Sequence, residues 1–268
     1  MDSPTPPASP MQNSLAPPPQ ASPVWPRTPR SLPAGRGASW WGEGWRVFTA
    51  APLLWIGCVV VMAIILIALG FIPLLGNVAQ ALLWPVFSGG LLLGCHALAG
   101  GRPLAFEHLF AGFRNARLGP LLILGVIAFA VGAAIAMTIM LLVFGALGFS
   151  GMAGFMTGDP AMMMGSAIAG MSIAALFAVP IALVVYALFM MAWWFAPALV
   201  ALNRADPVTA LRASFDASWK NLGAMLVYGL IFVGLAIVAS IPFGLGWLVL
   251  GPVAIGASYA GWREIFGE

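Results

Sequence analysis

Charged residues are scarce in this sequence of 268 residues. They make up 7% of the chain, whereas 62% of its residues are hydrophobic. Because a soluble domain carries charge on about a quarter of its residues, this composition excludes an ordinary soluble protein. The mean hydropathy of +1.00 places most of the chain in lipid. The basic residues occur singly, without the stripe that a phosphate backbone requires, so we expect no nucleic-acid partner.

Cysteines and catalytic motifs are scarce as well. The two cysteines, Cys58 and Cys95, lie inside apolar segments, which argues against a secreted disulfide framework. Together with His96 and His108 they match no metal-ligand spacing. The chain also lacks the G-x-S-x-G, H-E-x-x-H and P-loop motifs. We therefore expect no catalytic residue, no cofactor and no metal site, and we predict that the protein is not an enzyme.

Proline is concentrated at the N-terminus. Residues 1–38 hold half of the 22 prolines and show no apolar periodicity. Such a segment cannot bury enough surface to offset the entropy of ordering it. We predict that residues 1–38 are a disordered, proline-rich cytoplasmic tail and that residues 39–268 form the transmembrane domain.

Six long segments without charge follow the tail. They are residues 52–71, 78–99, 120–148, 166–202, 222–241 and 243–262. Each is long enough to cross a hydrocarbon core of about 30 Å, and the fourth is long enough to tilt, kink or protrude. We predict an all-α, polytopic membrane bundle of about six transmembrane helices in three hairpins. Residues 149–165, rich in methionine, are predicted to be a loop that caps the outer end of the bundle.

Three segments combine aromatic and charged residues. In residues 39–48, Trp41, Trp45 and Phe48 recur at helical spacing, which is typical of a helix at the headgroup level. Residues 102–117 contain a similar apolar stripe beside three arginines. Both patterns predict cytoplasmic helices that lie on the membrane surface.

The third of these segments is residues 203–221. Asp206 suits the N-cap of a helix, and Pro207 suits its first turn. Arg212, Asp216 and Lys220 then form a charge ladder at i, i+4 and i+8. An apolar stripe on the same helix is expected to face lipid or the bundle, and its members are Val208, Leu211, Phe215 and Trp219.

The basic residues set the orientation. With six crossings, all 11 lysines and arginines fall on one side of the membrane, together with both termini. By the positive-inside rule that side is the cytoplasm. We therefore predict a multi-pass protein of the bacterial inner membrane with cytoplasmic N- and C-termini.

Several motifs together carry a family resemblance. They are GWRVF (44–48), FAGF (110–113), WFAPAL (194–199), SFDASWKN (214–221), SY (258–259) and REIF (263–266). In combination they resemble a family of uncharacterised, multi-pass proteobacterial inner-membrane proteins, from about residue 45 to the C-terminus. The resemblance implies location and topology, and it brings no catalytic residue, substrate or cofactor.

These observations favour a non-enzymatic membrane component whose cytoplasmic face binds anionic lipid or a membrane protein partner. The residues expected to bind are Trp45, Arg46, Arg102, Arg114, Arg117, Arg212 and Lys220. We expect the arginines of the middle segment to dominate, because Asp216 dilutes the charge of the third.

Two other functions stay open. A passive channel or small-molecule transporter would use polar, uncharged residues inside the bundle, namely Ser88, Thr138, Tyr186 and Ser240. An enzyme would need a cleft around Glu107 and His108. Small residues such as Gly90 and Gly94 are expected to pack helices within the monomer, and a dimer interface is the alternative.

Overall fold

The described residues, 28–114 and 116–267, form helices and turns without a strand in this computed structural model. The elements, in chain order, are α1 (Arg36–Ala50), α2 (Pro52–Gly70), α3 (Leu75–Ala99), η2 (Phe106–Phe110), α4 (Ala111–Arg114), α5 (Leu118–Thr157), α6 (Pro160–Trp193), α7 (Ala196–Ala201), α8 (Pro207–Lys220), α9 (Leu222–Ser240) and α10 (Trp247–Phe266). The predicted all-α architecture is confirmed.

Five helical segments among the described residues are long and apolar enough to cross a membrane. They are Pro52–Gly70, Leu75–Ala99, Leu118–Gly148, Pro160–Ala201 and Leu222–Ser240. They correspond to the first five predicted crossings and confirm a polytopic helical membrane protein. The sixth predicted crossing forms α10, which carries Arg263 and Glu264 in its last turns and is not among the five. The structure therefore offers five candidate crossings where the sequence predicted about six.

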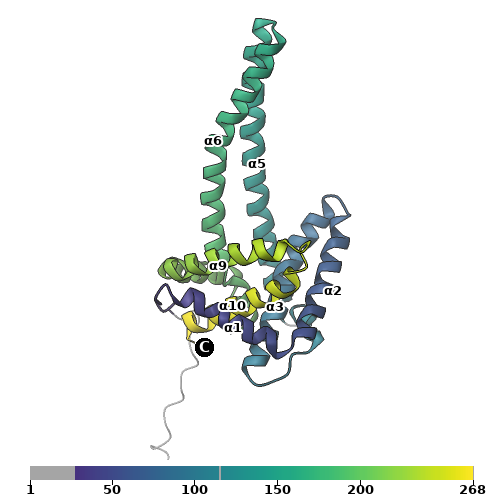
Figure 1. The fold of residues 1–268 in the computed structure, drawn as a ribbon, viewed down its shortest axis with the longest axis vertical. Helices are drawn as coiled ribbons and strands as arrows, with labels where there is room; N and C mark the ends of the chain where they lie inside the picture. The colour runs from purple at the N-terminus through teal and green to yellow at the C-terminus, as the bar shows by residue number, and fades with distance from the viewer. Residues whose placement is uncertain (1–27, 115, 268) are drawn as a thin grey trace, which may run out of the picture.

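The longest element is the hairpin of α5 and α6, which rises alone above the other helices (Figure 1). With 40 and 34 residues, the two helices span about 60 and 51 Å at a rise of 1.5 Å per residue. The predicted loop over residues 149–165 is wrong, because helix continues on both sides of a turn at Gly158 and Asp159. Gly158 supplies the left-handed conformation (φ 66°) and Asp159 caps α6 by accepting a hydrogen bond from the Ala161 amide over 2.9 Å. Met152, Met156, Met162 and Met164 are exposed toward the tip of this hairpin.

Helix α3 packs against η2 through glycines. A Cβ on Gly90 would lie 2.5 Å from the carbonyl oxygen of His108, and one on Gly94 would lie 2.8 Å from the side chain of Leu104. Gly90 therefore lets the backbone of the η2 turn approach α3, and Gly94 makes room for the side chain of Leu104, as expected for packing within the monomer. The described residues of the segment 102–117 do not form one surface helix, because a short 3₁₀ turn and one turn of α-helix take its place, with Leu109 fully buried.

Helix α6 ends where α8 packs against it. The amide of Phe195 donates a hydrogen bond to the Ser214 hydroxyl over 3.0 Å, and that hydroxyl donates to the carbonyl oxygen of Met191 over 2.9 Å. The Ser214 hydroxyl thus replaces the direct backbone hydrogen bond from the Phe195 amide to the Met191 carbonyl oxygen. This insertion into the hydrogen-bond ladder interrupts the helix at that point. Ser218 also donates to Met191, over 3.0 Å. The two buried serines hold α8 across the end of α6.

Helices α1 and α10 form the base of the molecule. A Cβ on Gly44 would overlap the carbonyl oxygen of Val253, so the two backbones touch. The predicted aromatic stripe of α1 divides, since Trp41 and Phe48 are each 7% exposed whereas Trp45 is 52% exposed. Trp41 stacks on Tyr228 of α9. The expectation that the whole stripe lies among headgroups is therefore wrong for Trp41 and Phe48.

Candidate functional site

The ends of several spanning helices meet at one end of the molecule. Gly89 of α3 packs on Leu121 of α5, and Gly125 of α5 packs on Leu82 of α3. These pairs show that α3 and α5 run antiparallel, so the end of α3 lies beside the start of α5. The end of α6 returns to the same place because α6 runs antiparallel to α5 in their hairpin.

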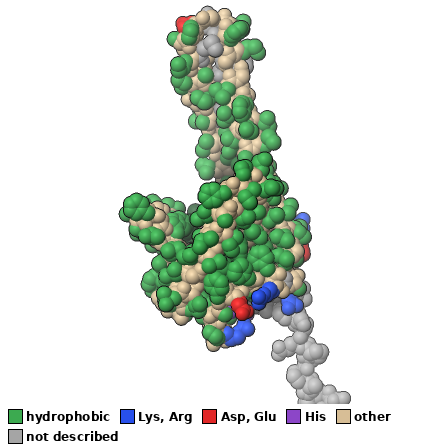
Figure 2. Space-filling model, turned by 90° about the vertical axis from the view of Figure 1, so that its right-hand side faces the viewer, with side chains coloured by type: hydrophobic (Ala, Val, Ile, Leu, Met, Phe, Trp, Pro, Cys, Tyr) green, Lys and Arg blue, Asp and Glu red, His purple; other side chains and the backbone are tan. Residues whose placement is uncertain are grey.

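Cations collect at this end of the molecule, and we call it the basic end. Its members outside the α1–α10 network described below are Arg46, Arg102, Arg114, Arg117, Arg204, Arg212 and Lys220. Asp159, at the hairpin tip, is the only charged residue between Arg117 and Arg204. Figure 2 shows this separation on one face: most of the blue side chains lie at the foot of the molecule, one lies higher at its right-hand edge, and the hairpin is free of them.

Four of the cations predicted to bind are free to do so. Arg46, Arg102, Arg212 and Lys220 are exposed, and none of them forms a side-chain hydrogen bond or ion pair within the part of the chain that the structure describes. The predicted ladder of α8 therefore does not close into ion pairs. Trp45 is exposed beside Arg46.

The other two predicted arginines already have partners. Arg114 lies 3.4 Å from Glu107 in an exposed ion pair. Arg117 is half-buried and donates a hydrogen bond to the carbonyl oxygen of Arg204 over 3.3 Å. Burial lowers the pKa of the Arg117 guanidinium, and the charge of Arg204 lowers it further. In the middle segment, only Arg102 is an unpaired cation.

Helix α8 presents its large side chains outward. The buried face consists of small residues, namely Ala210, Ala213, Ser214, Ala217 and Ser218. Val208 and Trp219, from the predicted apolar stripe, are 50% and 57% exposed. Of the two expectations for this stripe, a position facing the bundle is therefore wrong for its two ends, which point outward. The N-cap expectation is confirmed, because Asp206 accepts a hydrogen bond from the Thr209 amide over 3.0 Å.

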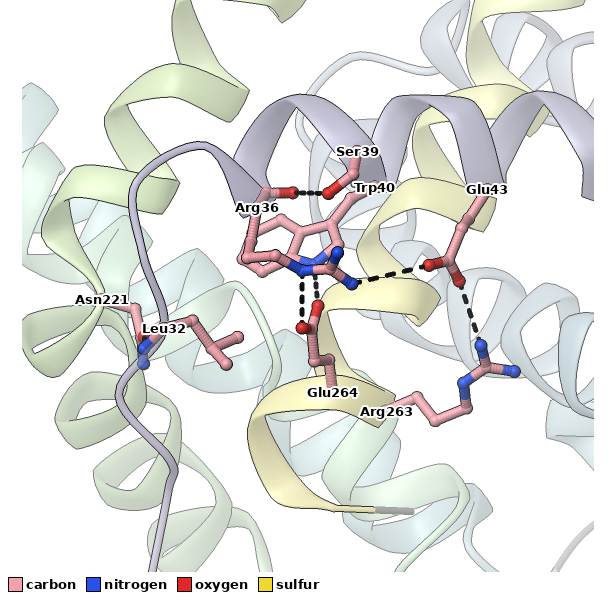
Figure 3. A network of polar contacts seen from close by, with 8 residues as sticks. All are labelled: Leu32, Arg36, Ser39, Trp40, Glu43, Asn221, Arg263 and Glu264. Atoms are coloured by element: carbon pink, nitrogen blue, oxygen red, sulfur yellow. Dashed lines mark hydrogen bonds and ion pairs between the residues drawn. The ribbon is translucent and has the colours of Figure 1, made fainter.

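A polar network joins α1 to the last turns of α10 (Figure 3). Arg36 pairs with Glu264 over 2.6 Å, and the indole of Trp40 donates to the same carboxylate over 2.8 Å. Arg263 donates to Glu43 over 3.0 Å. The hydrogen bond to Glu264 raises the pKa of the Arg36 guanidinium. Local sequence patterns do not reveal this network, because the partners lie more than 200 residues apart in the chain.

The segment before α1 is held in place by Asn221. Its side chain accepts a hydrogen bond from the Leu32 amide over 2.8 Å and donates to the Arg30 carbonyl oxygen over 2.9 Å. The Arg30 amide in turn donates to Ile265 over 2.8 Å. The packed part of the chain therefore begins before residue 39, and residues 1–27 of the predicted tail lie outside the described residues.

Three cavities bear on the functions that the sequence left open. A groove of about 550 Å³ between α3, α6, α9 and α10 is lined by Ser88 and Tyr186 among many apolar side chains. A cleft of about 390 Å³ is lined by Glu107 and His108. There Nδ1 of His108 lies 2.9 Å from the amide nitrogen of Ala105, which places the ring in a turn contact.

The third cavity lies between α1, α3 and α10 at the basic end. Its volume is about 250 Å³, and Arg46 and Arg263 line it together with apolar residues at the end of α3. No group of three or more His, Cys, Asp or Glu residues able to hold a metal ion occurs in residues 28–114 and 116–267.

Comparison with known proteins gives one match to report. The chain is 31% identical over 229 residues to the "Probable inner membrane protein BTH_II0599" of Burkholderia thailandensis. The match covers 84% of this chain and 80% of the relative. No family model matches the chain, and no solved structure matches it. Together with the five apolar helices, this similarity shows that the chain belongs to the family of this probable inner membrane protein and is a multi-pass protein of the inner membrane.

Proposed function

We propose that the protein is a non-enzymatic component of the inner membrane whose basic end faces the cytoplasm and binds anionic lipid. The observation that carries the proposal is the set of four exposed cations without an ion pair, Arg46, Arg102, Arg212 and Lys220, gathered where spanning helices end. At that level a cation lies close to lipid phosphates. Each cation near an anionic leaflet contributes about 1 kcal/mol of attraction.

The partners of the other charges support this proposal. Glu264 forms an ion pair with Arg36, and Glu43 forms one with Arg263. These two acids therefore do not neutralise the four unpaired cations. The exposed Trp45 and Trp219 lie beside Arg46 and Lys220 in the sequence, and indoles favour the headgroup region. Aromatic and basic side chains are thus presented together.

The experiment compares lipid enrichment around two versions of the full chain. The purified protein is placed in nanodiscs with equal amounts of phosphatidylglycerol and phosphatidylcholine, and the lipids that remain after mild delipidation are quantified. The parent should retain phosphatidylglycerol in excess. Replacing all four unpaired cations with glutamine should reduce that excess severalfold, because about 1 kcal/mol per cation is lost.

A matched control keeps the charge. In it Arg46, Arg102 and Arg212 become lysine and Lys220 becomes arginine, and phosphatidylglycerol enrichment should stay near that of the parent. Equal enrichment by the glutamine variant and the parent would show that these cations do not recruit lipid. If the glutamine variant loses an acidic protein that co-purifies with the parent while its lipids are unchanged, the partner is that protein.

A passive channel is the second candidate, supported by the groove of about 550 Å³ that Ser88 and Tyr186 share. Thr138 lines a separate cavity of about 270 Å³, and the Ser240 hydroxyl accepts a hydrogen bond from the indole of Trp247 over 3.2 Å. The four polar residues therefore do not follow one route. Flux of a small neutral solute into proteoliposomes, blocked by Ser88→Leu, would favour the channel over the lipid-binding function.

A further inference from the structure

The cavity between α1, α3 and α10, which we call the Arg46 pocket, lies at a defined depth. It is lined by Ala50, the last residue of α1, and Ala99, the last residue of α3. Helix α2 begins only two residues after Ala50, and both α2 and α3 are candidate crossings. The pocket therefore lies where two membrane-spanning helices end, which is the level of the lipid headgroups.

The pocket combines an available cation with a paired one. Arg46 is exposed and makes no side-chain hydrogen bond within the described chain. Arg263 gives one nitrogen to Glu43 over 3.0 Å, and a guanidinium has five N–H donors in all. Glu43 is the only acid in the lining, and it is bound by Arg263 and lies 4.0 Å from Arg36. The charge left in the pocket is positive.

The remaining walls are apolar apart from Tyr259, whose hydroxyl lies 3.1 Å from Nδ1 of His96. Val47, Ala50, Leu98 and Ala99 line the side that faces the ends of the spanning helices. The volume of about 250 Å³ is below the range of roughly 300 to 1,000 Å³ that suits a whole drug-sized ligand. It matches part of a ligand, with a charged group at the arginines and an apolar continuation toward the membrane.

We propose that the Arg46 pocket binds the phosphate of one anionic phospholipid, with Arg46 as the principal ligand and Arg263 as the second. Arginine suits this role because its planar fork forms paired hydrogen bonds with phosphate oxygens. The lipid glycerol lies against the apolar wall, and its acyl chains continue along α2 into the bilayer. This inference rests on the proposed function and names one place within the basic end, so the two can fail separately.

The test measures retention of the last lipid. The full chain in nanodiscs with phosphatidylglycerol is transferred to detergent, and native mass spectrometry counts the phosphatidylglycerol molecules that stay bound. Arg46→Gln should lower the occupancy of the tightest molecule about tenfold. Arg204→Gln is the matched control, because Arg204 is also an exposed arginine but neither lines the pocket nor belongs to the four cations proposed to bind lipid. The control should keep the parent occupancy.

A second variant tests the cavity without changing charge. Ala99→Leu adds bulk to the apolar wall and should lower occupancy as Arg46→Gln does. A thermal unfolding scan on each variant verifies that the fold is retained. Inorganic phosphate in the millimolar range should not displace the lipid, because phosphate alone lacks the apolar part of the contact. Displacement would show that the pocket is a free-phosphate site and would overturn the lipid assignment.

The outcomes separate the two proposals. If Arg46→Gln and Arg204→Gln lose lipid equally, the pocket is not a specific site while the basic end still recruits lipid. If Ala99→Leu keeps the parent occupancy, the cavity is not where the lipid sits. If neither these variants nor the variant without the four cations loses lipid, both proposals are overturned.

Discussion

Gly44 of α1 and Gly256 of α10 face one another at backbone contact. A Cβ added to Gly256 would lie 3.0 Å from the Cα of Gly44. The contact brings together the helix that carries Arg46 and the helix that carries Arg263. It therefore sets the width of the Arg46 pocket as well as the packing of the base.

The first prediction concerns this crossing. Gly44→Ala should destabilise the protein by about 1 to 3 kcal/mol, because the new methyl group overlaps the Val253 carbonyl and forces the backbones apart. Gly42→Ala is the control, since a Cβ there meets nothing within 4 Å. That change should be neutral or stabilising, because alanine favours helix. Thermal unfolding in detergent measures both, and equal melting temperatures would show that the crossing is looser than described.

The second prediction concerns the break at the end of α6. Ser214→Ala removes the hydroxyl that accepts from the Phe195 amide and donates to Met191. The buried amide is then left without a partner, which costs about 1 to 3 kcal/mol. Ser218→Ala removes one of the two hydroxyl donors to the Met191 carbonyl oxygen. Because the Ser214 hydroxyl still donates to that oxygen, the variant should lose less stability, about 1 kcal/mol.

Chemical denaturation of the two serine variants in detergent gives the comparison. The order expected is parent, then Ser218→Ala, then Ser214→Ala, from most to least stable. An equal loss for the two variants would mean that the amide of Phe195 finds another acceptor.

The third prediction concerns acid. The carboxylate of Asp206 caps α8, and its hydrogen bond with Thr209 lowers its pKa below the usual range. The ionised form therefore favours the folded state. Its contribution is present above the unfolded pKa of about 3.9 and is lost as the pH falls through the lower folded value.

Asp206→Asn isolates this contribution, because an amide can cap the helix but does not titrate. The difference in melting temperature between the parent and the variant should be constant from pH 8 to 5. It should then shift in favour of the variant below about pH 4, where the parent carboxylate becomes protonated. If the melting temperatures of the parent and the variant change in parallel down to pH 3, the cap does not depend on the charge of the carboxylate. Because the carboxylate is exposed, the shift should be small.

The sequence was sufficient for the parts of the fold that depend on local patterns. Uncharged apolar runs located five of the helices, and the Asp206–Pro207 pair located the start of α8. The turn between α5 and α6 was missed because glycines and methionines at residues 149–165 resemble a loop. Only two residues, Gly158 and Asp159, interrupt the helix in this segment, and Gly158 can adopt the positive φ that the turn requires.

The site was predictable only in part, because long-range pairing decides which charges are free. The sequence identified Arg46, Arg102, Arg212 and Lys220, and the structure leaves them exposed and unpaired. The sequence also identified Arg114 as a binding residue, but the ion pair of Arg114 with Glu107 depends on the conformation of the turn between them. Arg263 was identified for orientation alone, since its place beside Arg46 follows from the crossing of α1 and α10.

The fourth prediction tests the orientation of the basic end and the reach of the hairpin. In a chain with Cys58 and Cys95 replaced by alanine, single cysteines at Met156 and Val208 are treated with an impermeant thiol reagent. Both positions are exposed, at 83% and 50%. By the positive-inside rule, Met156 should be labelled in intact cells and Val208 only after the membrane is opened.

A cysteine at Val126, close to the start of α5, completes the test. Helix α5 spans about 60 Å, about twice the hydrocarbon thickness, so a hairpin near the membrane normal carries Met156 well beyond the lipid while Val126 stays inside it. Met156 should therefore react rapidly in water, and Val126 should stay protected after the membrane is opened. Slow labelling of Met156 would show that the hairpin tilts to keep its tip in the bilayer. Labelling of Val208 in intact cells would place the basic end outside and remove the cytoplasmic leaflet as its binding partner.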